Sequence, residues 1–173
     1  TVDYAGTPST ASQVITVLSG APPGSTFTFT PDADAYVKSD STGSNFGSAN
    51  NLRVRSGSTT IRSYLKFEVS GLSGPAVTAK LRLRVSDTGA DGGRVYLAGN
   101  TWTETGITWS NAPALGAAGA SIGLTGGVGT WIEITVPVTG NGTWTLAVAG
   151  GGTDPVWYDS RESANAPQLL IDS

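Results

Sequence analysis

Basic side chains are concentrated in one segment of this 173-residue sequence. Eight of the ten lysines and arginines lie between Lys38 and Arg84, together with only two acidic residues. This segment has a net charge of +6, whereas the other residues, two basic and eleven acidic, sum to −9 and bring the chain to −3. Guanidinium and ammonium groups gathered in this way bind carboxylates and sulfates. The segment therefore predicts a surface for an acidic ligand.

The spacing of these residues predicts where their side chains point. Three runs, at 52–55, 61–69 and 79–85, alternate apolar with polar residues, as Leu65 and Lys66 do. Successive side chains of a strand point to opposite faces of the sheet. If the three strands share a sheet, one face would gather the predicted ligand-binding residues, which are Arg53, Arg55, Arg62, Tyr64, Lys66, Arg82 and Arg84. The alternative is that these cations keep the strands soluble and discourage edge pairing.

The composition excludes most catalytic machinery. The chain has no histidine and no cysteine, which removes imidazole bases, thiolate nucleophiles and disulfides. Three carboxylate pairs remain, Asp32 with Asp34, Asp87 with Asp91 and Asp159 with Glu162, but a glycosidase needs a pair that converges across a cleft. Tyr64 beside Arg62 is the candidate acid or base of a lyase. We predict a binding module without catalytic residues.

A calcium site is the one metal centre that the sequence suggests. Asp32 and Asp34, with Asp40 at the start of the oxygen-rich segment 40–51, offer the hard ligands that Ca²⁺ prefers. Their spacing does not match an EF-hand loop. Asn, Ser and Gly in such a segment are equally typical of a tight loop. We expect no required cofactor and, at most, a structural calcium ion held by Asp32, Asp34 and Asp40.

Short β-rich runs separated by Gly, Ser, Asn and Pro clusters indicate the fold. Charged residues make up only 13% of the chain, and no window has the period of an amphipathic helix. We predict an all-β, antiparallel two-sheet β-sandwich that is jelly-roll-like. Residues 111–128, rich in Ala and Gly, are expected to form an irregular loop. The predicted strands are 26–30, 33–37, 52–55, 61–69, 79–85, 93–98, 107–109, 129–136, 143–149, 155–159 and 168–171.

The domain boundary is marked by residues 19–25, whose sequence SGAPPGS is typical of a linker. We assign residues 1–25 to the N-terminal tail of an upstream β-domain plus this Pro/Gly linker, with a disordered tail as the alternative. Residues 26–173 form the β-sandwich module. No apolar run approaches the length of a membrane helix, and the N-terminus lacks the order of a signal peptide. We expect a piece of a longer protein without a membrane span.

Several motifs together resemble a known family. Their order is DADAYV, SNFGSANNLRV, RSYLKFEVSGL, AKLRLRV, WTETGITWSNAP, GTWIEITV and DSRESANAPQLLI, from about Thr30 to the C-terminus. This order resembles the DNRLRE-domain family, which overlaps carbohydrate-binding module family 96. The motif that names the family corresponds to residues 159–162 here, with Ser160 in place of Asn and no Leu between Ser160 and Arg161.

The resemblance implies a non-catalytic module attached to secreted bacterial enzymes or surface proteins. Members studied as binding modules recognise alginate-like anionic polysaccharides through basic side chains. In the matching segments this implies ligand-binding roles for Arg53, Arg55, Arg62, Lys66, Lys38 and Arg161. Arg161 and Glu162 could instead form a buried structural pair.

Charge and resemblance thus lead to one leading hypothesis. We predict a secreted bacterial module, monomeric within a multidomain protein, that binds an acidic polysaccharide and targets an attached enzyme to it. We expect no nucleic-acid partner, because aromatic residues are sparse among the basic ones. The alternative is a structural spacer or adhesin domain without a glycan ligand.

Overall fold

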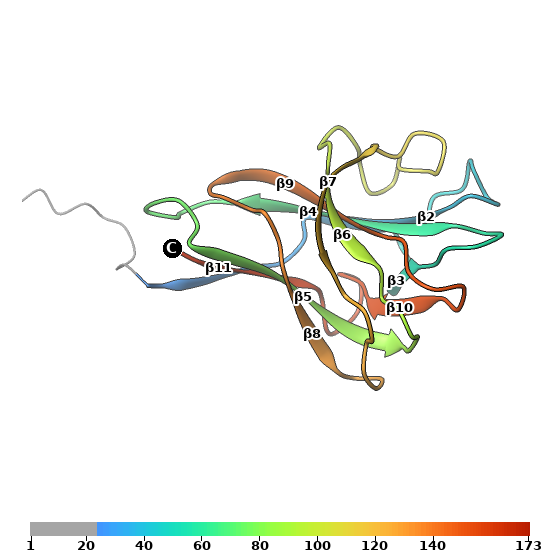
Figure 1. Cartoon of the computed structure of the whole chain (residues 1–173). Coiled ribbons are helices and arrows are strands. Elements are labelled where there is room, and N and C mark those ends of the chain that lie inside the picture. The colour runs from blue at the N-terminus through green and yellow to red at the C-terminus, as the bar shows by residue number, and fades with distance from the viewer. Residues whose placement is uncertain (1–23) are drawn as a thin grey trace, which may run out of the picture.

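The computed structural model describes residues 24–173, which form eleven β-strands (Figure 1). The predicted upstream tail and linker lie, up to residue 23, outside the described residues. Within the described part no segment is helical, so it contains no helix long and apolar enough to cross a membrane. The predicted all-β class is confirmed.

Six strands form one antiparallel sheet, called here the six-stranded sheet. Its order is β1–β11–β5–β10–β3, and β8 pairs with the other edge of β5. β11 and β10 pair with successive halves of β5, because β5 is the longest strand of the sheet. The bounds are β1 Thr26–Phe29, β3 Asn51–Val54, β5 Thr78–Asp87, β8 Trp131–Thr135, β10 Val156–Asp159 and β11 Gln168–Asp172.

The other five strands form the second layer of the sandwich, called the five-stranded sheet. Its order is β2–β4–β9–β6–β7, so β2 and β7 are its edges. Consecutive strands β3 and β4 lie in different sheets, which separates the basic side chains of β4 from those of β3 and β5. The bounds are β2 Ala33–Lys38, β4 Ile61–Val69, β6 Arg94–Ala98, β7 Leu115–Ser121 and β9 Gly142–Ala149.

The main core lies between the two sheets. Leu65 and Phe67 of β4 face Leu81 and Leu83 of β5, and all four are at most 1% exposed. Burial of each such side chain contributes about 1.5–3 kcal/mol. The alternation read from the sequence therefore identifies correctly which residues of these strands point inward.

A third layer covers part of the outer face of the five-stranded sheet. Residues 99–114, the yellow segment above β4 and β2 in Figure 1, contribute Trp102 and Ile107 to a second apolar cluster. The cluster also contains Val37 of β2, Tyr64 of β4 and Ala147 of β9. We call residues 99–114 the covering segment.

Two strand predictions were wrong. Residues 107–109 form no strand, because the amides of Gly106 and Ile107 both donate to the carbonyl of Thr103 in a turn of the covering segment. Part of the expected irregular loop is the strand β7. Its Gly and Ala residues carry no side-chain pattern, and backbone pairing with β6 at a shifting register forms it.

The covering segment is locked to the loop between β2 and β3. Asn45 Nδ2 donates to the carbonyl oxygens of Glu104 and Ile107, at 2.7 and 2.8 Å. Gly47 packs so closely there that a Cβ on it would lie 2.1 Å from the Glu104 carbonyl oxygen. Because the obstacle is backbone, only glycine fits at position 47.

We therefore predict that Gly47→Ala destabilises the domain by about 1–3 kcal/mol through overpacking. Thermal unfolding should show a melting temperature lower by several degrees. Gly43→Ala in the same loop is the matched control, because a Cβ there meets nothing within 4 Å. Equal melting temperatures for the two variants would contradict the close contact.

Candidate functional site

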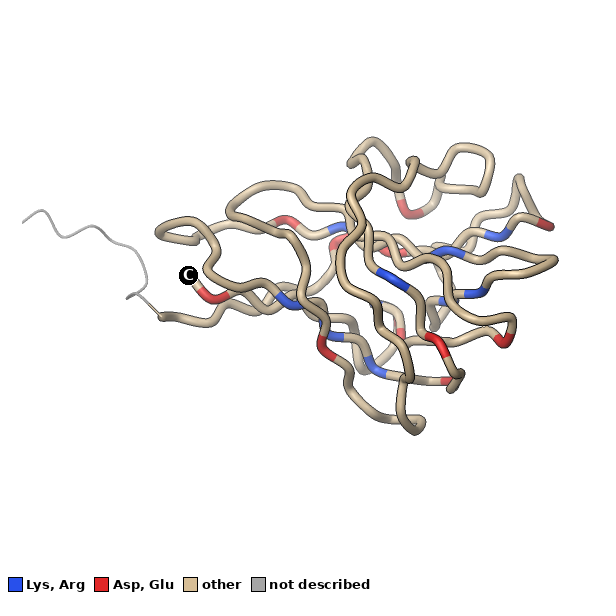
Figure 2. The backbone as a smooth tube through the Cα atoms, viewed as in Figure 1, with Lys and Arg blue, Asp and Glu red and all other residues tan. Residues whose placement is uncertain are grey.

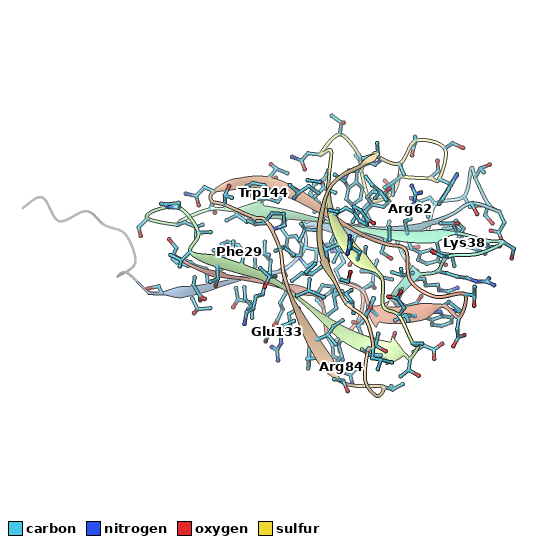
Figure 3. All side chains as sticks on the ribbon, in the orientation of Figure 1. Phe29, Lys38, Arg62, Arg84, Glu133 and Trp144 are labelled. Carbon is cyan, nitrogen blue, oxygen red and sulfur yellow. The ribbon has the colours of Figure 1, made fainter. Side chains whose placement is uncertain are left out.

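The predicted basic residues do not share one surface. Lys and Arg positions are spread over both layers in Figure 2, and Figure 3 places Arg62 on the upper layer and Arg84 below the lower one. Arg53 and Arg84 belong to strands of the six-stranded sheet, whereas Arg62 and Lys66 belong to β4 of the other sheet. The premise that the three basic strands share a sheet is wrong for β4.

Tyr64 does not face solvent, so the prediction that it offers its ring to a ligand is wrong. The side chain points to the outer face of β4, as alternation predicts, but the covering segment lies on top of it and leaves 0% exposed. Its hydroxyl donates to the Pro113 carbonyl at 2.9 Å. Burial also raises the pKa of Tyr64, which further disfavours a role as a catalytic base.

The cations on either side of Tyr64 also contact the covering segment. The Arg62 guanidinium lies 4.8 Å from the ring centre of Trp109, and the Lys66 ammonium lies 4.6 Å from that of Trp102. Lys66 also donates to the Trp102 carbonyl. These cation–π contacts tie the third layer to β4.

All three cations of β5 have acidic partners. Lys80 and Arg82 lie 3.2 and 3.7 Å from Glu133, and Arg84 lies 2.8 Å from Asp159. On β2, Lys38 pairs with Asp40 at 3.3 Å. Desolvation raises the pKa of Asp40, but hydrogen bonds with Thr59, Ser41 and Lys38 and the charge of Lys38 together outweigh it, so the pKa of Asp40 is lowered. These ion pairs reduce the net positive charge predicted for the sheet face.

Arg53 has a different environment, which we call the arginine clamp and define as Tyr36, Arg53 and Trp157. The guanidinium lies 4.0 Å from the ring centre of Trp157 and 4.9 Å from that of Tyr36. β3 pairs with β10 in a register that sets Arg53 opposite Trp157. Tyr36 reaches it from β2 and stacks in turn on Phe46, with ring centres 4.4 Å apart.

The clamp fixes the orientation of the Arg53 guanidinium and leaves its outer edge available. Nε donates to Asn51 Oδ1 at 2.7 Å. None of the six ion pairs in residues 24–173 involves Arg53, and its terminal amines donate to no acceptor in that range. A planar guanidinium with two free donors matches a carboxylate or sulfate in bidentate geometry.

Arg55 lies next to the clamp along the same chain. It lies two positions after Arg53 in extended backbone, a rise of about 7 Å. Its Nε donates to the Thr153 carbonyl at 2.8 Å, and within the described residues it takes part in no ion pair. A second half-buried guanidinium thus follows the first toward the tip of the β3–β4 connection.

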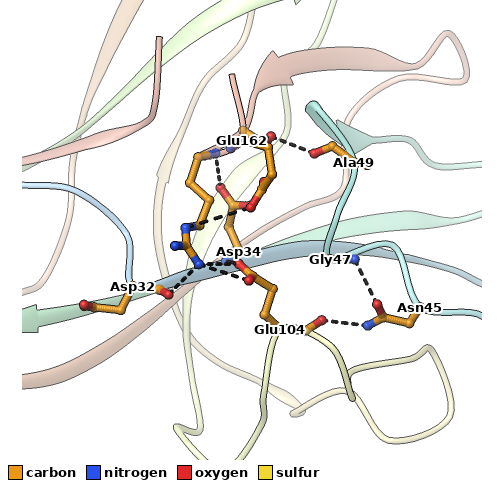
Figure 4. A network of polar contacts seen from close by, with 9 residues as sticks. Asp32, Asp34, Asn45, Gly47, Ala49, Glu104 and Glu162 are labelled. Carbon is orange, nitrogen blue, oxygen red and sulfur yellow. Dashed lines mark hydrogen bonds and ion pairs between the residues drawn. The ribbon is translucent and has the colours of Figure 1, made fainter. Parts of the chain in front are cut away.

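Arg161 lies in a structural network. Its guanidinium donates to both carboxylate oxygens of Glu104, at 2.9 and 3.0 Å, and to the Asp32 carbonyl at 2.8 Å (Figure 4). The predicted partner Glu162 lies farther away, at 3.9 Å. The Arg161 amide donates to Asp34 Oδ2 at 2.8 Å. Hydrogen bonds with Glu104 raise the pKa of Arg161. Because its guanidinium binds groups of the domain itself, Arg161 has a structural role.

The same network surrounds Asp34, which is 1% exposed. Burial raises the pKa of the Asp34 carboxyl from 3.8 to about 8, although the hydrogen bond from the Arg161 amide opposes the shift. The negative charges of Glu162 and Glu104 and a hydrogen bond with Glu162 raise the pKa further. The Asp34 carboxyl therefore keeps its proton to a much higher pH than an exposed aspartate does.

Of the three predicted calcium ligands, only Asp34 lies in a group of converging carboxylates. Asp34, Glu104 and Glu162 have oxygens within 4.8 Å of one another, whereas Asp32 accepts the Glu68 amide and Asp40 pairs with Lys38. Arg161 already supplies a positive charge to the first group. The calcium site stays a prediction, with only Asp34 of its three proposed ligands in the converging group.

The sequence reasoning missed Tyr36, Trp157 and Glu104, which shape both the clamp and the network. Tyr36 and Glu104 lie inside the family-like motifs DADAYV and WTETGITW, so their positions were visible. Trp157 could not be connected to Arg53, because the β3–β10 pairing joins segments about one hundred residues apart.

Comparison with protein families identifies the family of this chain. The model of carbohydrate-binding module family 96 matches residues 25–173. No curated protein matches the chain. The matched range contains all eleven strands, the arginine clamp and the Arg161 network.

The pKa of Asp34 predicts how stability depends on pH. Because its folded pKa is raised above 3.8, its stabilising contribution is complete below about pH 4 and is lost as the pH rises through about 8. Asp34→Asn keeps both an acceptor for the Arg161 amide and a neutral group beside Glu162. We expect the urea midpoint of the variant, relative to the original chain, to rise between pH 5.5 and pH 9.

A difference between the two chains that stays constant over this range would show that Asp34 is ionised in the folded state. Asp40→Asn is a suitable control, because the pKa of Asp40 is lowered and its titration falls below this range.

Proposed function

The chain belongs to carbohydrate-binding module family 96, and we propose that it binds an acidic polysaccharide through Arg53 in the arginine clamp, with Arg55 beside it. The ligand class is a polymer whose sugar residues carry carboxylates, such as a uronate polymer. Family membership supports a carbohydrate ligand and a non-catalytic role. The acidic character of the ligand is our proposal from the chemistry of the basic side chains.

The observation that carries the proposal is the Arg53 guanidinium with two unused donors. Two aromatic rings pack against the guanidinium and restrict its motion, so few conformations are lost when a ligand binds. A hydrogen bond to a charged group contributes about 1.5–3 kcal/mol, which corresponds to about 10–150-fold in affinity. A sugar carboxylate makes two such bonds with one arginine, whereas a neutral hydroxyl does not.

Within a longer protein, this binding would hold an attached catalytic domain close to its polymer. Tethering raises the effective concentration of substrate without any change in the catalytic site. Targeting of a secreted enzyme is therefore the role we propose for the module.

A structural spacer is the second candidate, and one observation favours it. Lys38, Lys80, Arg82, Arg84 and Arg161 all have acidic partners in the domain. A spacer would need such ion pairs for solubility and stability alone. It would not need a guanidinium held between two rings with its donors free, and this favours the binding role.

Substitution of Arg53 tests the proposal. We expect Arg53→Gln to weaken binding to alginate or polygalacturonate by about tenfold or more, because the charge and the fork are both lost. The affinity of Arg53→Lys should lie between those of the original chain and Arg53→Gln, because an ammonium keeps the charge without the bidentate geometry. Isothermal titration calorimetry at fixed ionic strength gives the affinities, and thermal unfolding checks the fold.

The matched control is Lys80→Gln, which removes the same charge from an exposed side chain of the same sheet. It should bind as the original chain does. Equal weakening in Lys80→Gln and Arg53→Gln would assign binding to net charge. Absence of binding to both acidic polymers by the original chain would favour the spacer.

A further inference from the structure

A hollow lies on the outer face of the five-stranded sheet. Its volume is about 460 Å³. It is open to solvent and formed by the ends of β6, β7 and β9 and their connections. Its lining includes Asp91, Gly93, Arg94, Tyr96, Ser121 and Gly150.

Arg94 supplies the positive charge of this hollow. It alternates with inward-facing Val95, so it points outward together with Tyr96. Its Nε donates to Ser121 Oγ at 3.0 Å, and within residues 24–173 it joins no ion pair. Like Arg53, it is oriented through Nε and keeps its terminal amines free.

The position of Arg94 is not explained by protection of a sheet edge. Its strand β6 lies between β9 and β7, so it has no free edge that needs a charge. A larger hollow of about 520 Å³ in the covering segment has no charged residue in its lining. The hollow with Arg94 is therefore the one whose chemistry suits an acidic group.

Backbone forms the floor of the hollow. Gly93, Gly123, Gly150 and Gly151 have φ values of 92°, 66°, 81° and 87°, which residues with a Cβ rarely adopt. A Cβ on Gly93 would also lie 2.9 Å from the Ala149 carbonyl oxygen. Glycine at these positions lets the chain turn tightly and leaves the space above it open.

The polar groups around this floor suit one acidic sugar residue. Asp91 accepts the Gly93 amide through Oδ1, at 2.9 Å, which leaves its second oxygen for a sugar hydroxyl. The half-buried ring of Tyr96 offers an apolar surface, and Arg94 offers donors for a carboxylate. A ring, one cation and one anion around a shallow hollow match a sugar acid with neighbouring hydroxyls.

We propose that this hollow is a second binding site for a carboxylated sugar residue, centred on Arg94 with Tyr96 and Asp91. The inference rests on the proposed function. Arg53 and Arg94 lie on the outer faces of opposite sheets, and such sheets pack about 10 Å apart with a closed core between them. Each face holds its own segment of glycan, so one domain can bridge two polysaccharide chains.

Titration with a galacturonic acid trimer tests this, because a trimer is too short to reach both faces. We expect two sites per chain by calorimetry, and shifts of the Gly93, Gly123 and Gly150 amide signals in ¹⁵N spectra. Arg94→Gln should leave one site and abolish those shifts, and Arg53→Gln should leave one site with the shifts retained. The double variant should not bind, whereas the charge-matched Lys80→Gln should keep both sites.

Tyr96→Leu is a milder second variant, and we expect it to weaken the Arg94 site several-fold, because the flat ring surface is lost while an apolar side chain still packs on the second cluster. One site in the original chain that Arg94→Gln does not affect would overturn this inference and leave the proposed function standing. One site that Arg94→Gln abolishes and Arg53→Gln leaves intact would overturn the Arg53 proposal and keep this hollow. Absence of trimer binding to the original chain would overturn this inference, and the polymer titration above decides the proposed function separately.

Discussion

The ion pair between Arg161 and Glu104 holds the third layer of the domain in place. Arg161 follows the last residues of β10 in one sheet, and Glu104 belongs to the segment that covers the other sheet. The same guanidinium binds the chain just before β2 through the Asp32 carbonyl. With the covering segment fixed, its tryptophans contact Arg62 and Lys66. A contact that touches no ligand in our proposal thereby holds in place the tryptophans that contact two cations of β4.

Alternation of side chains predicted the strands well where large apolar residues mark the inner face. The run 61–69 is an example, since Leu65 and Phe67 can be buried only if it is extended. β7 could not be predicted, because its Gly and Ala residues are partly or fully exposed and its pairing with β6 uses backbone alone. The sequence also could not predict which of the two sheets each strand joins. Short-range patterns determine which face of a strand is apolar, but strand partners depend on contacts distant in sequence.

In the candidate site, too, the sequence predicted the direction of a side chain but not its neighbours. The charge pattern placed Arg53 among several candidates, and its outward direction was correct, but the rings that hold it come from β2 and β10. Tyr64 also points outward as alternation predicts and is nevertheless buried, because exposure depends on what else packs on that face. A signal for the covering segment was present in the sequence. Trp102, Ile107 and Trp109 lie in a segment where only the short run 107–109 was interpreted as a strand, and three such side chains need an apolar surface to cover.

The free arginines also determine what kind of recognition is physically possible. With a net charge of −3, the whole chain repels a polyanion at long range, and five of its ten cations have acidic partners. At physiological salt this repulsion is screened beyond about 8 Å, so contacts at the surface decide the affinity. Directional hydrogen bonds from an oriented guanidinium act in that range, and a diffuse positive field is not required. Such a module would distinguish polymers by where their carboxylates stand along the chain rather than by their total charge.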